Sequence, residues 1–105
     1  MTESAWITSL RADGSPRSVR VWFAPDGAER WIATSLSTNK VADIRRDPRV
    51  SFVVEGIDAV LYGDATLVDI GSRPDILKSF ADRYNGWDAA DPVYGERVFI
   101  RVVPR

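Results

Sequence analysis

Residues 33–41 read Ala-Thr-Ser-Leu-Ser-Thr-Asn-Lys-Val and join the end of an expected strand to the beginning of an expected helix. Backbone N–H groups are unpaired in the first turn of a helix, and the helix dipole is positive there. The junction therefore favours an anion such as a phosphate, with Lys40 supplying a full positive charge. The hydroxyl donors would be Thr34, Ser35, Ser37 and Thr38. The alternative is that these residues are ordinary helix caps and that Lys40 is solvated; the residues alone leave both interpretations open.

Apolar and polar residues alternate along short segments on both sides of this junction, as they do in strands with one buried face. Turn signals such as Asp13-Gly14 separate these segments. Gly63, inside a long segment, indicates a bulge or a tight bend. The expected strands are Ala5–Leu10, Arg17–Phe23, Arg30–Thr34, Arg49–Glu55, Ala59–Val68 and Arg97–Val103. The expected helices are Lys40–Arg46 and Arg73–Tyr84. Six strands and two short helices predict a mainly β fold, a compact antiparallel barrel.

The chain has 105 residues, which predicts a single domain over residues 1–105. Its net charge of −1 gives no indication of a nucleic-acid partner. No apolar run reaches membrane-spanning length, and the opening Met-Thr-Glu-Ser is unlike a signal peptide. With the absence of cysteine, these features lead us to expect a cytoplasmic protein with no membrane partner.

The chain contains neither histidine nor cysteine. Their absence excludes a Ser-His-Asp triad, a cysteine nucleophile and the commonest zinc ligands. Three acidic residues near the C-terminus match no metal-loop spacing, so no metal site is predicted. These residues are Asp88, Asp91 and Glu96. If the protein is an enzyme, a bound organic cofactor must carry the reaction, and we predict no catalytic side chain.

Four tryptophans are many for a chain of this length. We expect Trp6 and Trp31 to serve in packing, which is the commoner role of tryptophan. Trp22 alternates away from the apolar face of its strand, so packing and stacking on a ligand ring remain open for it. Trp87 follows the second helix, where a substrate pocket and an interface are both possible locations.

The order of these segments resembles that of the pyridoxamine 5′-phosphate oxidase-like, FMN-binding split-barrel superfamily. The resemblance rests on a strand ending Val-Trp-Phe, on Ala-Thr-Ser-Leu-Ser-Thr-Asn-Lys, and on Val-Ala-Asp-Ile-Arg-Arg-Asp-Pro-Arg-Val after it. It runs from about Ala5 to Val68, and more loosely to Val103. It is nearer to an actinobacterial branch that includes deazaflavin-dependent members. The resemblance implies a six-stranded antiparallel split β-barrel; members usually begin with an N-terminal helix, which this sequence lacks before its first strand.

The resemblance also implies which residues contact a cofactor. Its phosphate would lie against the strand end and the helix start, where Asn39 stands in place of the family's usual arginine. The ring would lie along the second strand, and Asp58 would reach the ring edge from a partner subunit. The implied cofactor-binding residues are Ser18, Arg20, Val21, Trp22, Ala33, Thr34, Ser35, Asn39, Lys40 and Asp58.

Together, these implications predict a homodimeric oxidoreductase that transfers a hydride to an unidentified small-molecule substrate. The cofactor would be FMN or the deazaflavin coenzyme F-420, and the sequence does not choose between them. The long acidic tail of a deazaflavin would need further cations, for which Arg17, Arg20 and Arg45 are available. The alternative is a non-catalytic module that binds or stores a flavin or a tetrapyrrole. A small nucleic-acid-binding barrel is a remoter third interpretation.

Overall fold

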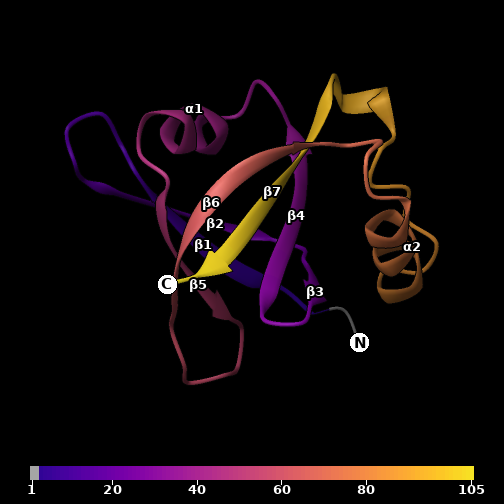
Figure 1. The fold of residues 1–105 in the computed structure, drawn as a ribbon, viewed down its shortest axis with the longest axis horizontal. Coiled ribbons are helices and arrows are strands. Elements are labelled where there is room, and N and C mark those ends of the chain that lie inside the picture. The colour runs from indigo at the N-terminus through magenta and orange to yellow at the C-terminus, as the bar shows by residue number, and fades with distance from the viewer. Residues whose placement is uncertain (1–2) are drawn as a thin grey trace.

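The computed structural model describes residues 3–105, which form seven strands, two α-helices and a short 3₁₀ helix (Figure 1). The strands are β1 (Ala5–Leu10), β2 (Pro16–Val21), β3 (Ala24–Asp26), β4 (Glu29–Ser35), β5 (Arg49–Val54), β6 (Leu61–Asp69) and β7 (Arg97–Pro104). The helices are α1 (Asn39–Arg46), α2 (Pro74–Arg83) and the 3₁₀ helix η1 (Pro92–Tyr94). The predicted mainly β fold with two helices is confirmed. No helix in residues 3–105 combines the length and apolar character that a membrane span requires.

The predicted number of six strands is wrong, because a seventh strand, β3, forms where a turn was expected. Its three residues pair with β4, from Ala24 opposite Trp31 to Asp26 opposite Glu29. Gly27, with φ of 60°, makes the tight turn between them. A strand of three residues is too short to show an alternating pattern, and the Pro-Asp-Gly signal of the turn covers most of it.

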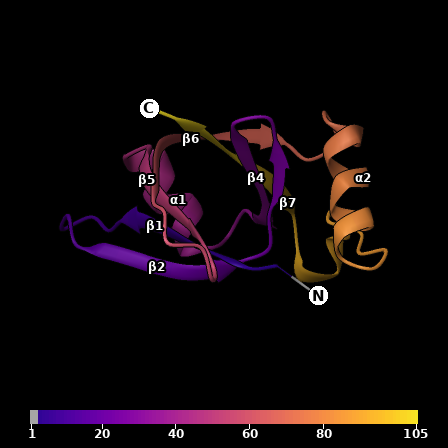
Figure 2. The same ribbon diagram turned by 90° about the horizontal axis from the view of Figure 1, so that it is seen from below.

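All seven strands lie in one antiparallel sheet with the order β2-β1-β5-β6-β7-β4-β3. The two edge strands, β2 and β3, are joined directly by residues 22–23. A connection of two residues can span the sheet edges only if the sheet curls until the edges approach, and the result is a curled half-barrel (Figure 2). Because β3 pairs only with Glu29–Trp31, the outer edge of β4 beyond Trp31 has no strand partner among the described residues. This open seam positions the candidate site.

Strands β4 and β7 run between the two α-helices, with α1 on one side and α2 on the other (Figures 1 and 2). Both faces of these strands are therefore buried. Ile32 and Ile100 pack into the core on the α1 side, whereas Trp31 and Phe99 pack against α2. Trp31 is 1% exposed, which confirms its predicted packing role. Trp6 is 42% exposed on the outer face of β1, so it is not a core residue, and packing at an interface stays a prediction for it.

Helix α1 is fastened to the β1–β2 hairpin by one buried carboxylate. Asp43 is 2% exposed. Its Oδ2 accepts hydrogen bonds from Ser9 Oγ at 2.9 Å and from Arg17 Nε at 2.7 Å, and Arg46 donates to Oδ1 at 3.0 Å. Burial raises the pKa of Asp43, but the bonds from Arg17 and Ser9 outweigh it, so the pKa lies below the usual 3.8. This cluster holds the start of α1, and with it Lys40, over the seam.

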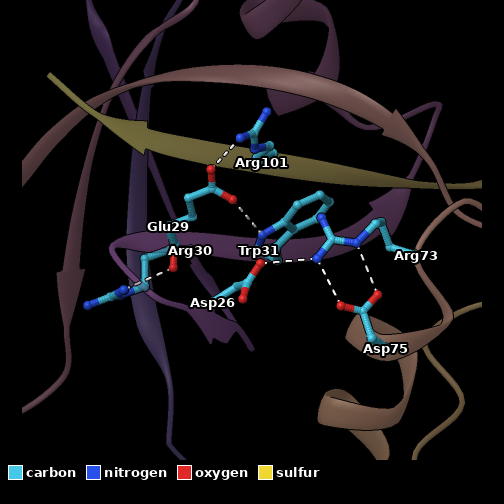
Figure 3. Close-up of polar contacts among 7 residues, drawn as sticks. All are labelled: Asp26, Glu29, Arg30, Trp31, Arg73, Asp75 and Arg101. Carbon is cyan, nitrogen blue, oxygen red and sulfur yellow. Dashed lines mark hydrogen bonds and ion pairs between the residues drawn. The ribbon is translucent and has the colours of Figure 1, made fainter.

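The beginning of α2 is tied to the β3–β4 hairpin by a surface network (Figure 3). Arg73 donates to Asp75 at 2.8 Å and to Asp26 at 3.1 Å, and its guanidinium lies 4.8 Å from the centre of the Trp31 ring. Arg101, whose guanidinium lies 6.0 Å from the centre of the same ring, is paired with Glu29. The Arg101 hydrogen bond holds the pKa of Glu29 below its usual value. These contacts lie away from the seam and serve to anchor α2.

Candidate functional site

A cavity of about 690 Å³ opens at the seam of the curled sheet. It is bounded by the end of β2, the unpaired end of β4, the first turn of α1, the beginning of β7 and the loop after α2. We call it the main cavity. Its lining residues are Ser4, Arg20, Val21, Trp22, Ala33, Thr34, Lys40, Trp87 and Arg97. Its volume is in the range of cavities that hold cofactor-sized ligands.

Two cations, Lys40 and Arg97, share the main cavity without a neutralising anion. No carboxylate of residues 3–105 lies within the 4.0 Å salt-bridge distance of either side chain. Burial lowers the pKa of Lys40, and repulsion from Arg97 lowers it further. Burial also lowers the pKa of Arg97, partly offset by Asp91. Two desolvated like charges destabilise each other, and an anion between them would remove that cost. Lys40 and Arg97 therefore make the main cavity a candidate anion site.

Arg97 is held in place by three contacts. Its Nε donates to the carbonyl oxygen of Ala89 at 3.1 Å, and Nη1 donates to Ser35 Oγ at 3.3 Å. Its guanidinium carbon lies 5.9 Å from the centre of the Trp87 ring. Because these contacts leave donors of the guanidinium unused, Arg97 can still bind an anion beside Lys40. Ser35, predicted as a phosphate donor, instead orients Arg97 and does not line the main cavity.

Another wall of the main cavity is aromatic. Trp22 stacks on Tyr84 with ring centres 4.5 Å apart and an angle of 5° between the planes. Trp87 stands at 87° to Trp22 with ring centres 5.1 Å apart. Trp22 therefore packs on Tyr84 and also lines the main cavity, as Trp87 does, so stacking of a ligand ring on Trp22 stays a prediction.

A second cavity of about 510 Å³, which we call the side cavity, lies on the other side of Lys40. Its lining residues are Arg11, Arg17, Ser18, Val19, Ser37, Thr38, Asn39 and Lys40. Lys40 is common to both cavities. The hydroxyl of Thr38 donates to the Ser35 carbonyl at 3.0 Å, so its proton is already engaged within the turn.

The structure thus divides the predicted site residues. Six of them line the main cavity, namely Arg20, Val21, Trp22, Ala33, Thr34 and Lys40. Ser18 and Asn39 line the side cavity with Lys40. Asp58 is exposed in the β5–β6 loop and lines neither cavity of its own chain. Arg20 is paired with Glu55 at 2.8 Å and Arg17 with Asp43 at 2.7 Å, so neither charge is fully available to a ligand.

Sequence reasoning missed Ser4 and Arg97 as cavity residues. Arg97 lies 57 positions after Lys40 by residue number, and only the pairing of β4 with β7, which sets Ser35 opposite Arg97, brings it there. The pairing of two distant strands leaves no local signal in the sequence. The departure from the family's arginine at Asn39 was visible in the sequence, but nothing in the sequence pointed to Arg97 as a second cation.

The sequence profile of the pyridoxamine 5′-phosphate oxidase family matches residues 2–105. The chain belongs to this family. A search of curated proteins finds no match. Among solved structures, a conserved hypothetical protein from Mycobacterium tuberculosis is 28% identical, with a TM-score of 0.79, over 97% of this chain and 72% of that one.

A structure named F420 reductase is 26% identical to this member of the pyridoxamine 5′-phosphate oxidase family, with a TM-score of 0.75, over 97% of this chain and 86% of that one. The haem storage protein HutZ from Vibrio cholerae has a TM-score of 0.80 over 97% of this chain and 81% of that one. Its identity of 13% shows a shared fold alone. Family membership therefore accounts for the fold, and the evidence for function comes from the residues of the main cavity.

Proposed function

We propose that the protein binds a flavin-type cofactor by its phosphate, between Lys40 and Arg97, and serves as an oxidoreductase for a small-molecule substrate. The observation that carries the proposal is the pair of desolvated cations without an anionic partner in the main cavity. When bound, a flavin or deazaflavin ring supplies hydride transfer, which this chain, lacking histidine and cysteine, does not provide by itself.

The residues present fit a phosphate. Lys40 supplies a mobile point charge, and Arg97 supplies a planar fork of donors that suits two phosphate oxygens. Thr34, only 5% exposed and lining the same cavity, offers a hydroxyl at the unpaired end of β4. In this arrangement Arg97 replaces the cation that is missing at Asn39. The family's phosphate site is thereby rebuilt with a residue from β7.

Either FMN or coenzyme F-420 suits this site, and two observations favour F-420. One similar structure is named F420 reductase. The side cavity, reached past Lys40, carries Arg11, which forms no salt bridge among residues 3–105 and could meet an acidic tail. Arg17 contributes less, because it is engaged with Asp43.

Titration of the purified protein with FMN and with coenzyme F-420, followed by the ligand's fluorescence, tests the proposal. We expect Lys40→Ala to weaken binding by about tenfold or more, since one charge-assisted phosphate contact contributes about 1.5–3 kcal/mol. The chain has only one other lysine, Lys78, which is exposed on α2 and paired with Asp82 at 2.7 Å. Lys78→Ala is the matched control and should leave the affinity unchanged. Equal affinities for the two variants, or no binding of either cofactor, would refute the phosphate site.

The alternative of a storage module for a tetrapyrrole is less well supported by the residues. Haem iron is usually held by histidine, cysteine, methionine or tyrosine. The first two are absent from the sequence. The hydroxyl of Tyr84 is buried in hydrogen bonds to backbone groups of Glu3 and Phe23. Oxidation of the reduced cofactor by acceptors, measured by absorbance, separates an oxidoreductase from a storage module.

We also infer that the protein is a homodimer, from the apolar outer face of β1, β5 and β6. Register places Trp6 opposite Val53 and Ser51 opposite Tyr62, on the face away from Ile7 and the core. Tyr62 is 64% exposed and Trp6 is 42% exposed. A second copy would cover this face, and the nearby β5–β6 loop would carry Asp58 toward the partner's site. Contiguous exposed apolar surface of this kind is typical of an interface.

Substitution Tyr62→Glu tests the homodimer. A charge in the middle of an apolar interface should convert the dimer to a monomer, because burying an unpaired carboxylate costs several kcal/mol. Light scattering coupled to gel filtration gives the mass directly, against 11.7 kDa for one chain. Val93→Glu is the control, since Val93 is a hydrophobic residue of similar exposure, 69%, but lies in η1. A wild-type mass of 11.7 kDa would contradict the dimer.

A further inference from the structure

Trp22 has an unusual environment for a half-exposed tryptophan. It is 40% exposed, lines the main cavity and follows directly after β2. Tyr84 covers one face of its indole at a ring separation of 4.5 Å, with the planes 5° apart. Trp87 meets its edge at 5.1 Å. The exposed surface of Trp22 therefore belongs largely to its second face, which is open to the cavity.

The support behind Trp22 is rigid. The hydroxyl of Tyr84 accepts a hydrogen bond from the Phe23 N–H at 3.0 Å and can donate to the carbonyl of Glu3 at 2.7 Å or of Phe23 at 2.9 Å. Arg83 donates to the same Phe23 carbonyl at 3.0 Å. Tyr84 is thus fixed to the backbone that carries Trp22. A stacking surface that is already ordered loses little conformational entropy when a ligand ring binds to it.

The aromatic wall is also close to the cationic wall. Trp87 contacts Trp22 on one side and lies 5.9 Å from the Arg97 guanidinium on the other. One ligand that carries both a flat ring and an anionic group can therefore use both walls of the same cavity. Indole presents an electron-rich face, which suits an electron-poor conjugated ring.

We propose that Trp22 is the stacking platform for the ring of the cofactor, with Trp87 closing one edge. This inference rests on the proposed function, because it concerns the ring of the ligand whose phosphate Lys40 and Arg97 hold. It assigns the Trp22 side chain a specific role in selecting a flat conjugated ligand over other phosphate esters. The family resemblance placed the ring along the second strand and Asp58 at the ring edge, but it implied no stacking partner for the ring.

The test compares Trp22→Leu with Trp22→Phe, using FMN or coenzyme F-420, whichever the wild-type protein binds. Leucine keeps apolar bulk and removes the π face, whereas phenylalanine keeps a smaller one. We expect Trp22→Leu to weaken cofactor binding by about tenfold, as loss of one aromatic stacking partner does elsewhere. We also expect the emission of the bound cofactor, quenched by electron transfer from a stacked indole, to rise in both variants. Trp22→Phe should recover most of the affinity.

Inorganic phosphate, used as a competitor, separates stacking from damage to the fold. It occupies the Lys40–Arg97 end and has no ring, so its competition constant should be the same in the wild type and in Trp22→Leu. A parallel loss of phosphate and cofactor binding would show a merely structural role and overturn the inference. So would unchanged affinity and unchanged quenching in Trp22→Leu. Failure of the wild type to bind either cofactor would instead refute the proposed function on which this inference rests.

Discussion

Asp43→Asn is expected to lower the free energy of unfolding by about 3 kcal/mol, because it removes a buried carboxylate and leaves the partly buried guanidinium of Arg17 without its charged partner. Asp43 receives three hydrogen bonds, from Ser9, Arg17 and Arg46. An asparagine has a single acceptor oxygen, so its amide NH₂ must face at least one of these donors. For a domain of this size the melting temperature should fall by about 10–20 °C.

The pH dependence of this effect follows from the pKa of Asp43, which lies below its usual value of 3.8 in the folded protein. A carboxyl group with a depressed folded pKa stabilises the folded state above its unfolded pKa. That contribution disappears as pH falls through the folded pKa. The difference in unfolding free energy between the wild type and Asp43→Asn should therefore be largest near neutral pH and should shrink below pH 3.8. Denaturant unfolding across this pH range measures it.

Asp82→Asn is the matched control, since Asp82 forms a helix ion pair with Lys78 but is 64% exposed. An exposed pair contributes at most about 0.5 kcal/mol, so this variant should unfold almost as the wild type does. Similar losses in the two variants would contradict the assignment of Asp43 as the residue that fastens α1. Because α1 begins with Asn39 and Lys40, Asp43→Asn should also weaken cofactor binding where the protein is still folded.

The local features of the fold could be predicted from the sequence, and the long-range ones could not. Alternation and turn signals place six of the strands and both helices within a few residues of their bounds. Strand β3 was not predicted, because a segment of three residues is too short to show an alternating pattern. Alternation also predicts one buried face for each strand. In β4 this fails, because the α2 core buries Trp31 on one face while Ile32 is buried on the other.

The same limit applies to the candidate site. The junction at residues 33–41 and the charge of Lys40 are local features, and both lie at the main cavity. Arg97 and the backing of Trp22 by Tyr84 depend on contacts between distant segments. The departure at Asn39 could be seen in the sequence, but its compensation required the pairing of β4 with β7. Local reasoning therefore pointed to the candidate anion site and missed Arg97, one of its two cations.

A second large effect is expected at Gly63, in β6. Its register with β5 and β7 runs without an inserted residue, so the bulge considered from the sequence is absent and close strand approach is the reason for glycine. A Cβ atom at this position would lie 2.6 Å from the carbonyl oxygen of Val103 and 3.0 Å from the Val102 side chain. The first contact is with backbone, which cannot rotate away, so β6 and β7 would have to separate.

We expect Gly63→Ala to lower the free energy of unfolding by about 2–3 kcal/mol, in the range of overpacked core substitutions. Gly71→Ala is the matched control, because the nearest atom to its Cβ would be the Asp69 carboxylate at 3.4 Å, an ordinary contact with a mobile side chain. That variant should change stability by less than about 1 kcal/mol and can raise it, since alanine restricts the unfolded chain. Thermal unfolding of the two variants side by side gives the comparison. Equal stabilities would mean that β6 and β7 can separate at Gly63 at little cost. The close approach of these strands would then not explain the curl of the sheet that brings Arg97 to the main cavity.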